Sequence, residues 1–191
     1  VAYMQAGASA LSILTDEKFF GGSDLDLMTA RKFNFCPILK KDFIIDEYQI
    51  YDAKSTGADA VLLIASILTE KELRDFEKPA RSMGMEVLFE IHNEDDLRKL
   101  DLDNEKIIGV NNRDLKTFKT DISTSKRLAS LIPEHHVKVS ESGISDPSAI
   151  RELRKFGFKG FLIGENFMRS ADPGEACKSF IKQLRAGQDA D

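Results

Sequence analysis

The chain has 191 residues and a net charge of −5, with 42% hydrophobic and 31% charged residues. This length and composition predict one globular domain, residues 1–191, with enough apolar residues for a sizeable core. The mildly acidic charge argues against an extended nucleic-acid-binding surface, but it leaves room for a local cationic pocket that binds an anionic small molecule.

Neither a signal peptide nor an apolar run of the ~20 residues needed to span a membrane is recognisable. The two cysteines, Cys36 and Cys177, lie far apart and form neither a CxxC pair nor a cluster with histidines at zinc spacing. We therefore expect a cytoplasmic protein with two reduced, packed thiols and no metal site.

Short apolar, β-branched runs alternate with amphipathic stretches along the chain. The runs predicted to be strands are residues 10–14, 37–39, 60–64, 86–89, 107–110, 137–139 and 160–163. Helical patterns lie between them, for example over 70–83, 123–132 and 147–156. Strands that alternate with single helices pair in parallel, because a parallel crossover requires roughly a dozen residues or more.

Seven β/α units of this kind are one short of a (β/α)8 barrel. The chain opens with Val1, and VAYMQAGAS reads as the end of a helix, so we expect the first β/α unit to be absent. An open, doubly wound sheet is the competing architecture, and it would concentrate polar residues near one switch point. Here polar residues follow many different strands, which favours a TIM barrel of the α/β class.

Glycine and proline mark the predicted helix boundaries. Gly57, Gly84 and Gly157 stand just before strands, where C-terminal caps belong. Asp146-Pro147 fits an N-cap followed by proline in the first turn. Pro79 lies inside a helical pattern and predicts a kink or a break.

A lysine and a glutamate end two of the predicted strands. In CPILKKDFIID, alternation places Lys41 and Phe43 on one face and Lys40 on the other. Lys41 is a candidate proton donor or anion partner, with a solvated loop lysine as the simpler alternative. Glu90, after Val-Leu-Phe, is a candidate general base, with a helix-facing ion pair as the alternative. His92 shares the parity of Glu90, and a turn or capping role is its simpler interpretation.

Residues suited to anion binding follow the last three strands. Asn111 and Arg113 share one face, and the guanidinium of an arginine can give forked hydrogen bonds to a carboxylate or phosphate. The next two strands end in Glu141, Ser142 and Gly143, and in Gly164, Glu165 and Asn166. The loops after the last two strands of a barrel commonly bind phosphate, because glycines let backbone N–H groups approach an anion.

Together these segments resemble the successive motifs of indole-3-glycerol-phosphate synthase. The similarity covers about residues 7–169 and rests on ILTDEKFFGGS, PILKKDFIID, GADAVLLIASIL, EVLFEIHNEDDL, IIGVNNRDL, VSESGIS and FLIGENFMR. The combination of K-D-F, E, N-x-R-D-L and E-S-G-I after successive strands is highly specific. The resemblance implies a (β/α)8 carboxy-lyase of tryptophan biosynthesis that uses neither cofactor nor metal.

The implied reaction converts 1-(2-carboxyphenylamino)-1-deoxyribulose 5-phosphate into indole-3-glycerol phosphate by ring closure, decarboxylation and dehydration. By resemblance, Lys41 is the general acid and Glu90 the base of the later steps. The residues that match groups orienting the intermediate and the lysine are Asn111, Arg113, Glu141 and Ser142. The phosphate turns match Gly143, Gly164 and the backbone N–H of Glu165, and the apolar walls around the anthranilate ring match Phe20, Phe43 and Leu62.

The chain departs from the family's pattern in three places. The family's first strand carries a second lysine, a glutamate and a Ser-Pro-Ser phosphate loop, so we expect little synthase activity from these 191 residues alone. Lys40 replaces a residue that is usually apolar, and its long stem could carry the ammonium to solvent. Glu165 replaces a small residue, so its side chain must point away from the bound anion.

Two other functions stay open at this point. Another phosphate-binding barrel enzyme, such as phosphoribosylanthranilate isomerase, would place an acid and a cysteine at two strand ends, whereas Cys36 precedes its strand. A non-catalytic remnant would keep the phosphate site without the chemistry, and the pairing of Lys41 with Glu90 disfavours it. The expected partner is a small phosphorylated substrate, with no nucleic acid, membrane or obligate protein partner.

Overall fold

The computed structural model describes residues 1–115 and 117–186. Seven strands form one sheet in chain order, and each pairs in parallel with the next. The strands are β1 (Leu11–Leu14), β2 (Ile38–Lys41), β3 (Ala60–Ile64), β4 (Glu86–Ile91), β5 (Ile107–Asn111), β6 (Val137–Glu141) and β7 (Phe158–Leu162). The predicted alternation of strands and helices is confirmed.

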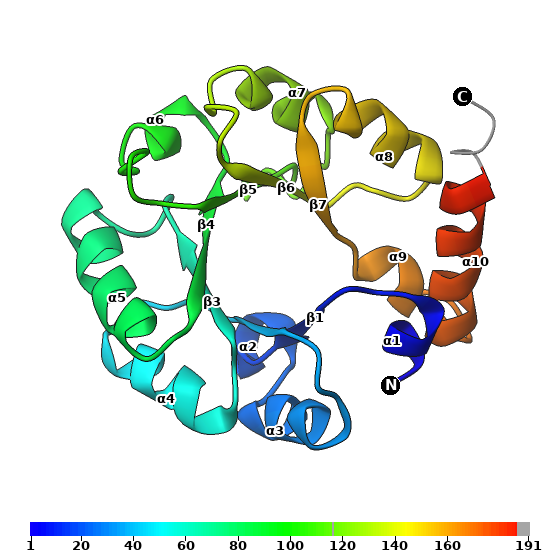
Figure 1. The fold of residues 1–191 in the computed structure, drawn as a ribbon, viewed down its shortest axis with the longest axis horizontal. Coiled ribbons are helices and arrows are strands. Elements are labelled where there is room, and N and C mark those ends of the chain that lie inside the picture. Colours follow the sequence, from blue (N-terminus) through cyan, green and yellow to red (C-terminus); the bar gives the residue numbers. More distant parts are fainter. Residues whose placement is uncertain (116, 187–191) are drawn as a thin grey trace.

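The helices lie outside the curled sheet (Figure 1). They are α1 (Ala2–Ala6), α2 (Glu17–Phe20), α3 (Asp24–Phe33), α4 (Tyr48–Thr56), α5 (Glu70–Ser82), α6 (Glu94–Leu97), α7 (Ser123–Ala129), α8 (Pro147–Arg154), α9 (Glu165–Met168) and α10 (Pro173–Ala186). A doubly wound sheet would have helices on both faces. The arrangement is therefore that of a curled (β/α) barrel, as the sequence predicts.

The two end strands of the sheet, β1 and β7, do not pair with each other within the described residues. The outer layer is continuous at this point, because α1 packs against α10 (Figure 1). The contact is close: a Cβ atom on Gly174 of α10 would lie 2.7 Å from the Cβ of Ala2. The first and last helices thus meet outside the gap between β1 and β7.

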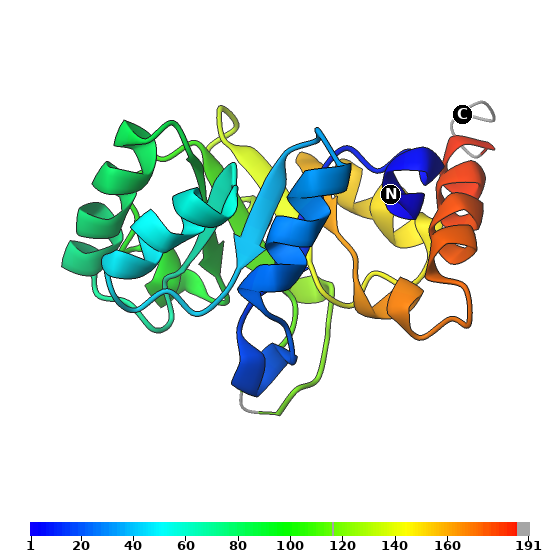
Figure 2. The same ribbon diagram turned by 90° about the horizontal axis from the view of Figure 1, so that it is seen from below.

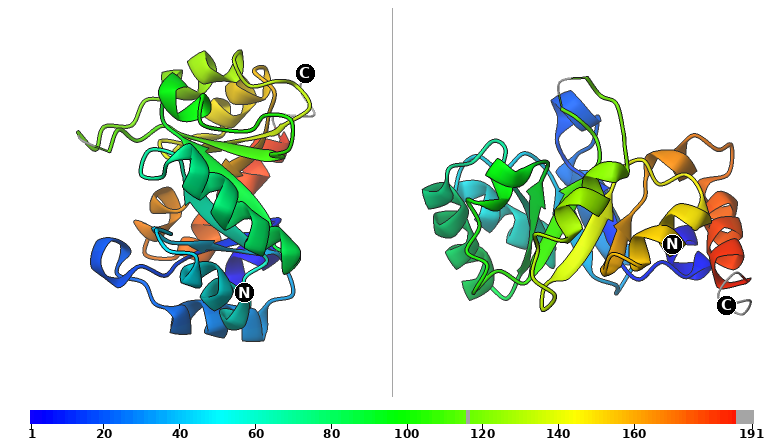
Figure 3. Two further views of the ribbon diagram at one scale, coloured as in Figure 1. Left: turned by 90° about the vertical axis from the view of Figure 1, so that its left-hand side faces the viewer. Right: turned by 90° about the horizontal axis from the view of Figure 1, so that it is seen from above.

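Two projections extend from the carboxyl ends of the strands. Helix α2 follows β1, and residues 112–115 and 117–121 follow β5. Both project from the same side of the molecule, and the left view of Figure 3 places them on opposite edges of that side (Figures 2 and 3). They flank the face at which barrel enzymes place their chemistry.

The sheet separates two apolar layers. The larger one lies between strands and helices and includes the fully buried side chains Leu27, Ile50, Leu73, Phe89 and Leu153. The smaller one fills the inside of the curl with Leu62, Ile64 and Leu88, against which Leu39, Phe43, Ile107, Val139 and Leu162 pack. A parallel strand with apolar groups on both faces is typical of this architecture.

The strands run further toward their carboxyl ends than their apolar runs indicate. The ends of β2, β4, β5 and β6 include Lys41, Glu90, Asn111 and Glu141, which the apolar patterns leave outside. Backbone pairing continues through these residues, for example from Asn111 to Glu141, because ladder hydrogen bonds do not depend on side-chain polarity. The functional side chains are consequently held on strands.

Most helix boundaries follow the predicted signals. Gly57 caps α4 in the left-handed region, at φ 98°, and the Asp146 side chain caps α8 ahead of Pro147. Helix α7 ends at Ala129, three residues before the predicted end at 132. Of the kink or break predicted at Pro79, the break does not occur: α5 continues through the proline to Ser82, with the neighbouring Ala80 buried in the core.

Lys40 faces the helices, as alternation predicts, but its ammonium does not reach solvent. The residue is 2% exposed, and its Nζ contacts Asp24 on α3, Asp52 on α4 at 2.8 Å and Asp42 at 3.9 Å. Burial alone would lower the pKa of Lys40, but hydrogen bonds to Asp24 and Asp52 outweigh it and raise the pKa. The proposed extension of the stem to solvent is therefore wrong, because nearby carboxylates stabilise the charge inside.

Replacing Lys40 with methionine should destabilise the fold by roughly 3 kcal/mol, the low end of the cost of breaking a buried ion pair. Methionine keeps the packing volume but leaves three carboxylates facing each other. Urea unfolding measures the change. Lys71→Met is the matched control, because Lys71 makes an exposed pair with Asp75, and its unfolding midpoint should not move. Equal midpoints for the two variants would contradict this interpretation.

Candidate active site

Three charged side chains meet inside the curl at the carboxyl ends of alternate strands. Lys41 from β2 places its Nζ 3.1 Å from Oε2 of Glu90 on β4 and 3.4 Å from Oε2 of Glu141 on β6. The side chains are 13%, 2% and 1% exposed, respectively. In this fold, side chains from alternate strands share one interior layer. The predicted residues Lys41, Glu90 and Glu141 therefore form one buried cluster.

Gly109 makes room for this cluster and was missed in the sequence. It lies on β5, between Glu90 of β4 and Val139 of β6 in register. A Cβ atom at this position would lie 2.3 Å from Oε1 of Glu141. A glycine inside an otherwise apolar strand signals such a close approach, and that signal was available in IIGVN.

The three charges shift each other's protonation. Burial would lower the pKa of Lys41, but Glu141 and Glu90 raise it well above its usual range. Burial would raise the pKa of Glu90, yet Lys41 and a hydrogen bond from Asn111 hold it below its usual range. Burial, together with the nearby charge of Glu90, raises the pKa of Glu141 to about 7 despite Lys41. At neutral pH the site holds an ammonium, a carboxylate and a second carboxyl group whose pKa is raised.

Asn111 and Arg113 extend the cluster toward the strand ends. The Asn111 side-chain amide donates to Oε1 of Glu90 at 3.0 Å, and its Oδ1 accepts the backbone N–H of Arg113 at 3.0 Å. The Arg113 guanidinium forms an ion pair with Glu165, which also pairs with Arg169. Glu165 thus directs its carboxylate to two arginines.

A tight turn follows β6. Ser142 and Gly143 are consecutive residues with positive φ, 65° and 73°. Asn112, which is 2% exposed and was also missed, anchors this turn: its side-chain NH₂ lies 3.0 Å from the Glu141 carbonyl oxygen and 3.1 Å from that of Ser142. Its Oδ1 accepts the backbone N–H of Ser125 on α7. The second predicted turn places Gly164 at the N-cap of α9.

Aromatic side chains lie over the same end of the curl. Phe20 on α2 stacks on Phe43 with ring centroids 5.0 Å apart and planes at 17°, and Phe19 packs edge-on against Phe43 at 5.3 Å. Phe43 packs against the inner cluster that contains the fully buried Leu62. The predicted apolar residues are therefore contiguous, and Phe19 joins them.

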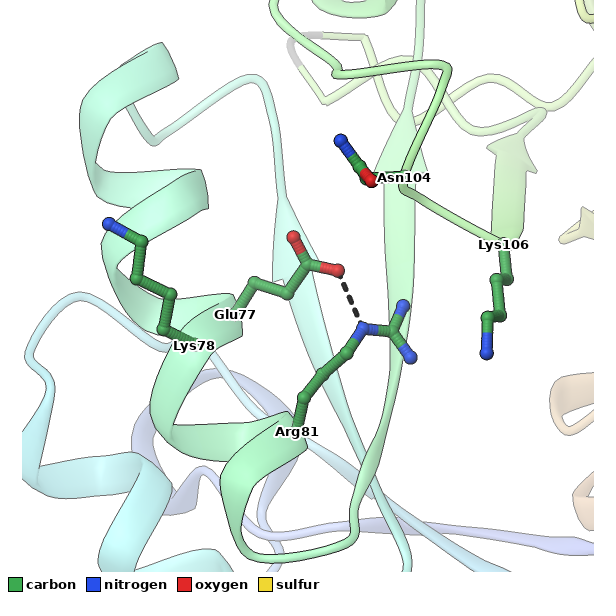
Figure 4. A pocket seen from close by; sticks show the side chains of 5 residues that line it. All are labelled: Glu77, Lys78, Arg81, Asn104 and Lys106. Atoms are coloured by element: carbon green, nitrogen blue, oxygen red, sulfur yellow. Dashed lines mark hydrogen bonds and ion pairs between the residues drawn. The ribbon is translucent and has the colours of Figure 1, made fainter.

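A separate hollow of about 310 Å³ lies at the opposite end of the strands (Figure 4). It is lined by Glu77, Lys78, Arg81, Asn104 and Lys106. Arg81 bonds to Glu77 at 2.7 Å and to Glu86 at 2.8 Å, so its charge is already paired. Residues at this end of a barrel are more often structural than catalytic.

Neither cysteine belongs to the cluster around Lys41. Cys36 and Cys177 are free, and Cys36 precedes β2, at the end away from Lys41. In the part of the chain that the structure describes, no three His, Cys, Asp or Glu side chains are grouped to hold a metal ion. Over the same residues, no helix is long and apolar enough to cross a membrane.

The fold and this site define a (β/α)-barrel enzyme with acid–base groups at the carboxyl ends of its strands. The family model for indole-3-glycerol phosphate synthase matches residues 1–180. An indole-3-glycerol phosphate synthase of Bacteroides thetaiotaomicron is 54% identical over 186 residues, covering 96% of this chain and 70% of the relative. One from Thermoanaerobacter sp. is 46% identical, covering 97% and 71%. The chain belongs to the indole-3-glycerol phosphate synthase family, the carboxy-lyases of tryptophan biosynthesis.

Solved structures of low sequence identity share the fold. The 3-hexulose-6-phosphate synthase of Salmonella typhimurium gives a TM-score of 0.72 at 14% identity, covering 91% of this chain and 87% of that one. A structure of native KDPGal gives 0.70 at 12% identity, covering 98% and 87%. These two likenesses support the barrel architecture alone.

Gly109→Ala should lower kcat by about 10²-fold, the scale of a misplacement of roughly 1 Å. The added methyl group would collide with the Glu141 carboxylate and displace it from Lys41. Steady-state kinetics of the full-length gene product measures the effect. In a Glu141→Ala background, Gly109→Ala should change kcat little, because the colliding carboxylate is gone.

Gly160→Ala is the matched control for this experiment. Its Cβ would lie 2.9 Å from a methyl carbon of Val139, which is also closer than real Cβ atoms come, although less close than the 2.3 Å at Gly109, and it involves no carboxylate. It should cost stability with a much smaller loss of kcat. Equal kcat losses in both variants would show that Gly109 acts through general packing.

Proposed function

We propose that the cluster around Lys41 performs the reaction of the family on 1-(2-carboxyphenylamino)-1-deoxyribulose 5-phosphate. The aromatic ring attacks the sugar carbonyl, carbon dioxide leaves, and loss of water gives indole-3-glycerol phosphate. The observation that carries this proposal is the buried ammonium of Lys41, 3.1 Å from Glu90 and 3.4 Å from Glu141. An ammonium fixed at the carboxyl ends of the strands can protonate an oxygen on which negative charge develops.

Lys41 acts as the general acid in ring closure. Its raised pKa keeps the ammonium protonated at neutral pH until a stronger proton acceptor forms beside it. The carbonyl oxygen becomes such an acceptor as the ring carbon attacks. Glu141, with a pKa raised to about 7, is well placed to return a proton to Lys41 at neutral pH.

Glu90 acts as the base in the later steps. Its lowered pKa keeps it ionised, and the Asn111 amide orients it through Oε1 at 3.0 Å. One oxygen faces Lys41 and the other faces Asn111, so the carboxylate has a defined direction. A fixed carboxylate can remove a proton from the intermediate without first being reoriented.

The anionic ends of the substrate require cations and free N–H groups. We assign the phosphate to the turns at Ser142–Gly143 and Gly164–Glu165, since successive backbone N–H groups in a turn can point at an anion. Arg113 forms an ion pair with Glu165, which belongs to the second turn, and it binds the substrate when that ion pair opens. Phe20 and Phe43, with Leu62 beneath them, form the wall for the anthranilate ring.

The protein acts on a small phosphorylated molecule in the cytoplasm, without cofactor or metal. Nucleic acid, membrane and an obligate protein partner have no part in this function. The acidic net charge and the acid–base cluster support this assignment.

Lys41→Met should lower kcat by ~10²–10⁴-fold while KM changes little, because a proton donor acts mainly in the transition state. Glu90→Gln should lower kcat with little change in stability. Both are measured in the full-length gene product by the fluorescence of the indole product. Wild-type turnover by Lys41→Met would remove Lys41 from the mechanism.

Inorganic phosphate should bind between the two turns with the aid of backbone N–H groups. A crystal soaked at a phosphate concentration that saturates binding in solution should place an anion within hydrogen-bonding distance of Gly143 and Glu165. Density at another place and none at these turns would contradict the assignment.

A further inference from the structure

His92 lies behind Glu90, on the side away from Lys41. The side chain follows β4, is 10% exposed, and places Nε2 3.3 Å from Oε1 of Glu90. This nitrogen is buried and makes no hydrogen bond of good geometry with the described residues. A buried polar atom left in this state calls for an explanation.

The opposite ring nitrogen is fully engaged. Nδ1 of His92 lies 2.9 Å from the Ser66 hydroxyl, and that hydroxyl donates to Oδ2 of Asp96 at 2.6 Å. The same Asp96 oxygen accepts the backbone N–H of His92 at 2.9 Å. Burial would raise the pKa of Asp96, but the His92 ring, the Ser66 hydroxyl and the His92 backbone hold it below its usual range. Asp96 is therefore a carboxylate that can only accept hydrogen bonds.

Only one assignment of donors and acceptors fits the hydrogen bonds that link His92, Ser66 and Asp96. A serine hydroxyl has a single proton, and here that proton is given to Asp96. The Ser66 oxygen must then accept a proton from Nδ1 of His92. The tautomer of a histidine is set by the partner of one nitrogen, so Nδ1 keeps its proton and Nε2 alone binds and releases one.

We propose that His92 is a positioning residue for the known reaction: held in one tautomer by Ser66 and Asp96, it exchanges a proton with Glu90 through Nε2. The proposal rests on the role of Glu90 as a base. When Glu90 has taken a proton from the intermediate, the Oε1–H bond breaks and an Nε2–H bond forms. Glu90 returns to the carboxylate, His92 becomes an imidazolium, and no electrons are exchanged.

The surroundings favour this transfer. Charged groups that face the pair are Lys41 on the other oxygen of Glu90, Glu141 beyond Lys41, and Asp96 on the Nδ1 side. The carboxylate of Asp96 stabilises an imidazolium through Ser66. Lys99 fixes the loop that carries Ser66, because its Nζ binds the carbonyl oxygens of Ala65 at 2.6 Å and Leu68 at 3.1 Å.

The tautomer can be read directly by NMR of the ¹⁵N-labelled chain. The sequence has three histidines, and His92→Gln assigns the signals of His92. At alkaline pH, neutral His92 should carry its proton on Nδ1, and Ser66→Ala should move it toward Nε2. Exposed His135 is the internal reference. A neutral His92 protonated on Nε2 in the wild type would overturn the proposal.

Kinetics of the full-length gene product then separates proton exchange from a structural role. The amide of His92→Gln can still donate a hydrogen bond to Glu90, but it cannot take up a proton. We expect kcat to fall about tenfold, less than the ~10²–10⁴-fold of a group that acts directly, with KM and Tm unchanged. Wild-type kcat in His92→Gln would overturn the proposal.

The Glu90→Gln variant tests the role of Glu90 as a base separately from its proton exchange with His92. If Glu90→Gln lowers kcat and His92→Gln does not, the role of Glu90 stands and that of His92 fails. If Glu90→Gln leaves kcat unchanged, the proposed function of Glu90 fails, and the proton exchange that depends on it fails as well.

Discussion

The contact of the Lys41 ammonium with Glu90 and Glu141 is the interaction on which the site depends. One cation lies between two buried carboxylates, at 3.1 and 3.4 Å, inside the curled sheet of parallel strands. Without the lysine, two acids would share a site that has little water, and at least one would have to be protonated. With it, one carboxylate stays ionised while the pKa of the other is raised, which places a base and a candidate acid in the same site.

Strand β2 carries a lysine on each of its faces, and each ammonium group is shielded from solvent. Lys40 and Lys41 are consecutive, so the pleat sends one to the helices and the other into the curl. Each is buried, and each is stabilised by carboxylates from elements distant in sequence: Asp24 and Asp52 for Lys40, Glu90 and Glu141 for Lys41. The outward lysine ties β2 to α3 and α4, and the inward one is the group to which we assign the role of proton donor.

Much of the fold follows from patterns that are local in sequence. The period of the apolar runs predicts seven parallel strands, and the parity of residues along β2 correctly separates Lys40 from Lys41. Other features depend on contacts between distant segments. Gly109 is required by Glu141 of the next strand, and the tautomer of His92 depends on Ser66 and Asp96. No local pattern reveals these partners. Nor does one reveal that Asp24 and Asp52 would hold the ammonium of Lys40 away from solvent.

The protonation of Glu90 and Glu141 can be measured directly by NMR of the chain labelled with ¹³C at the glutamate carboxyls. Glu141→Gln and Glu90→Gln assign the two signals. Glu105→Gln assigns a third, because burial also raises the pKa of Glu105 to about 7. We expect a pKa of about 7 for Glu141 and one below the usual range for Glu90, and we expect both to rise in Lys41→Met. Ordinary pKa values for both groups, unchanged by Lys41→Met, would contradict this expectation.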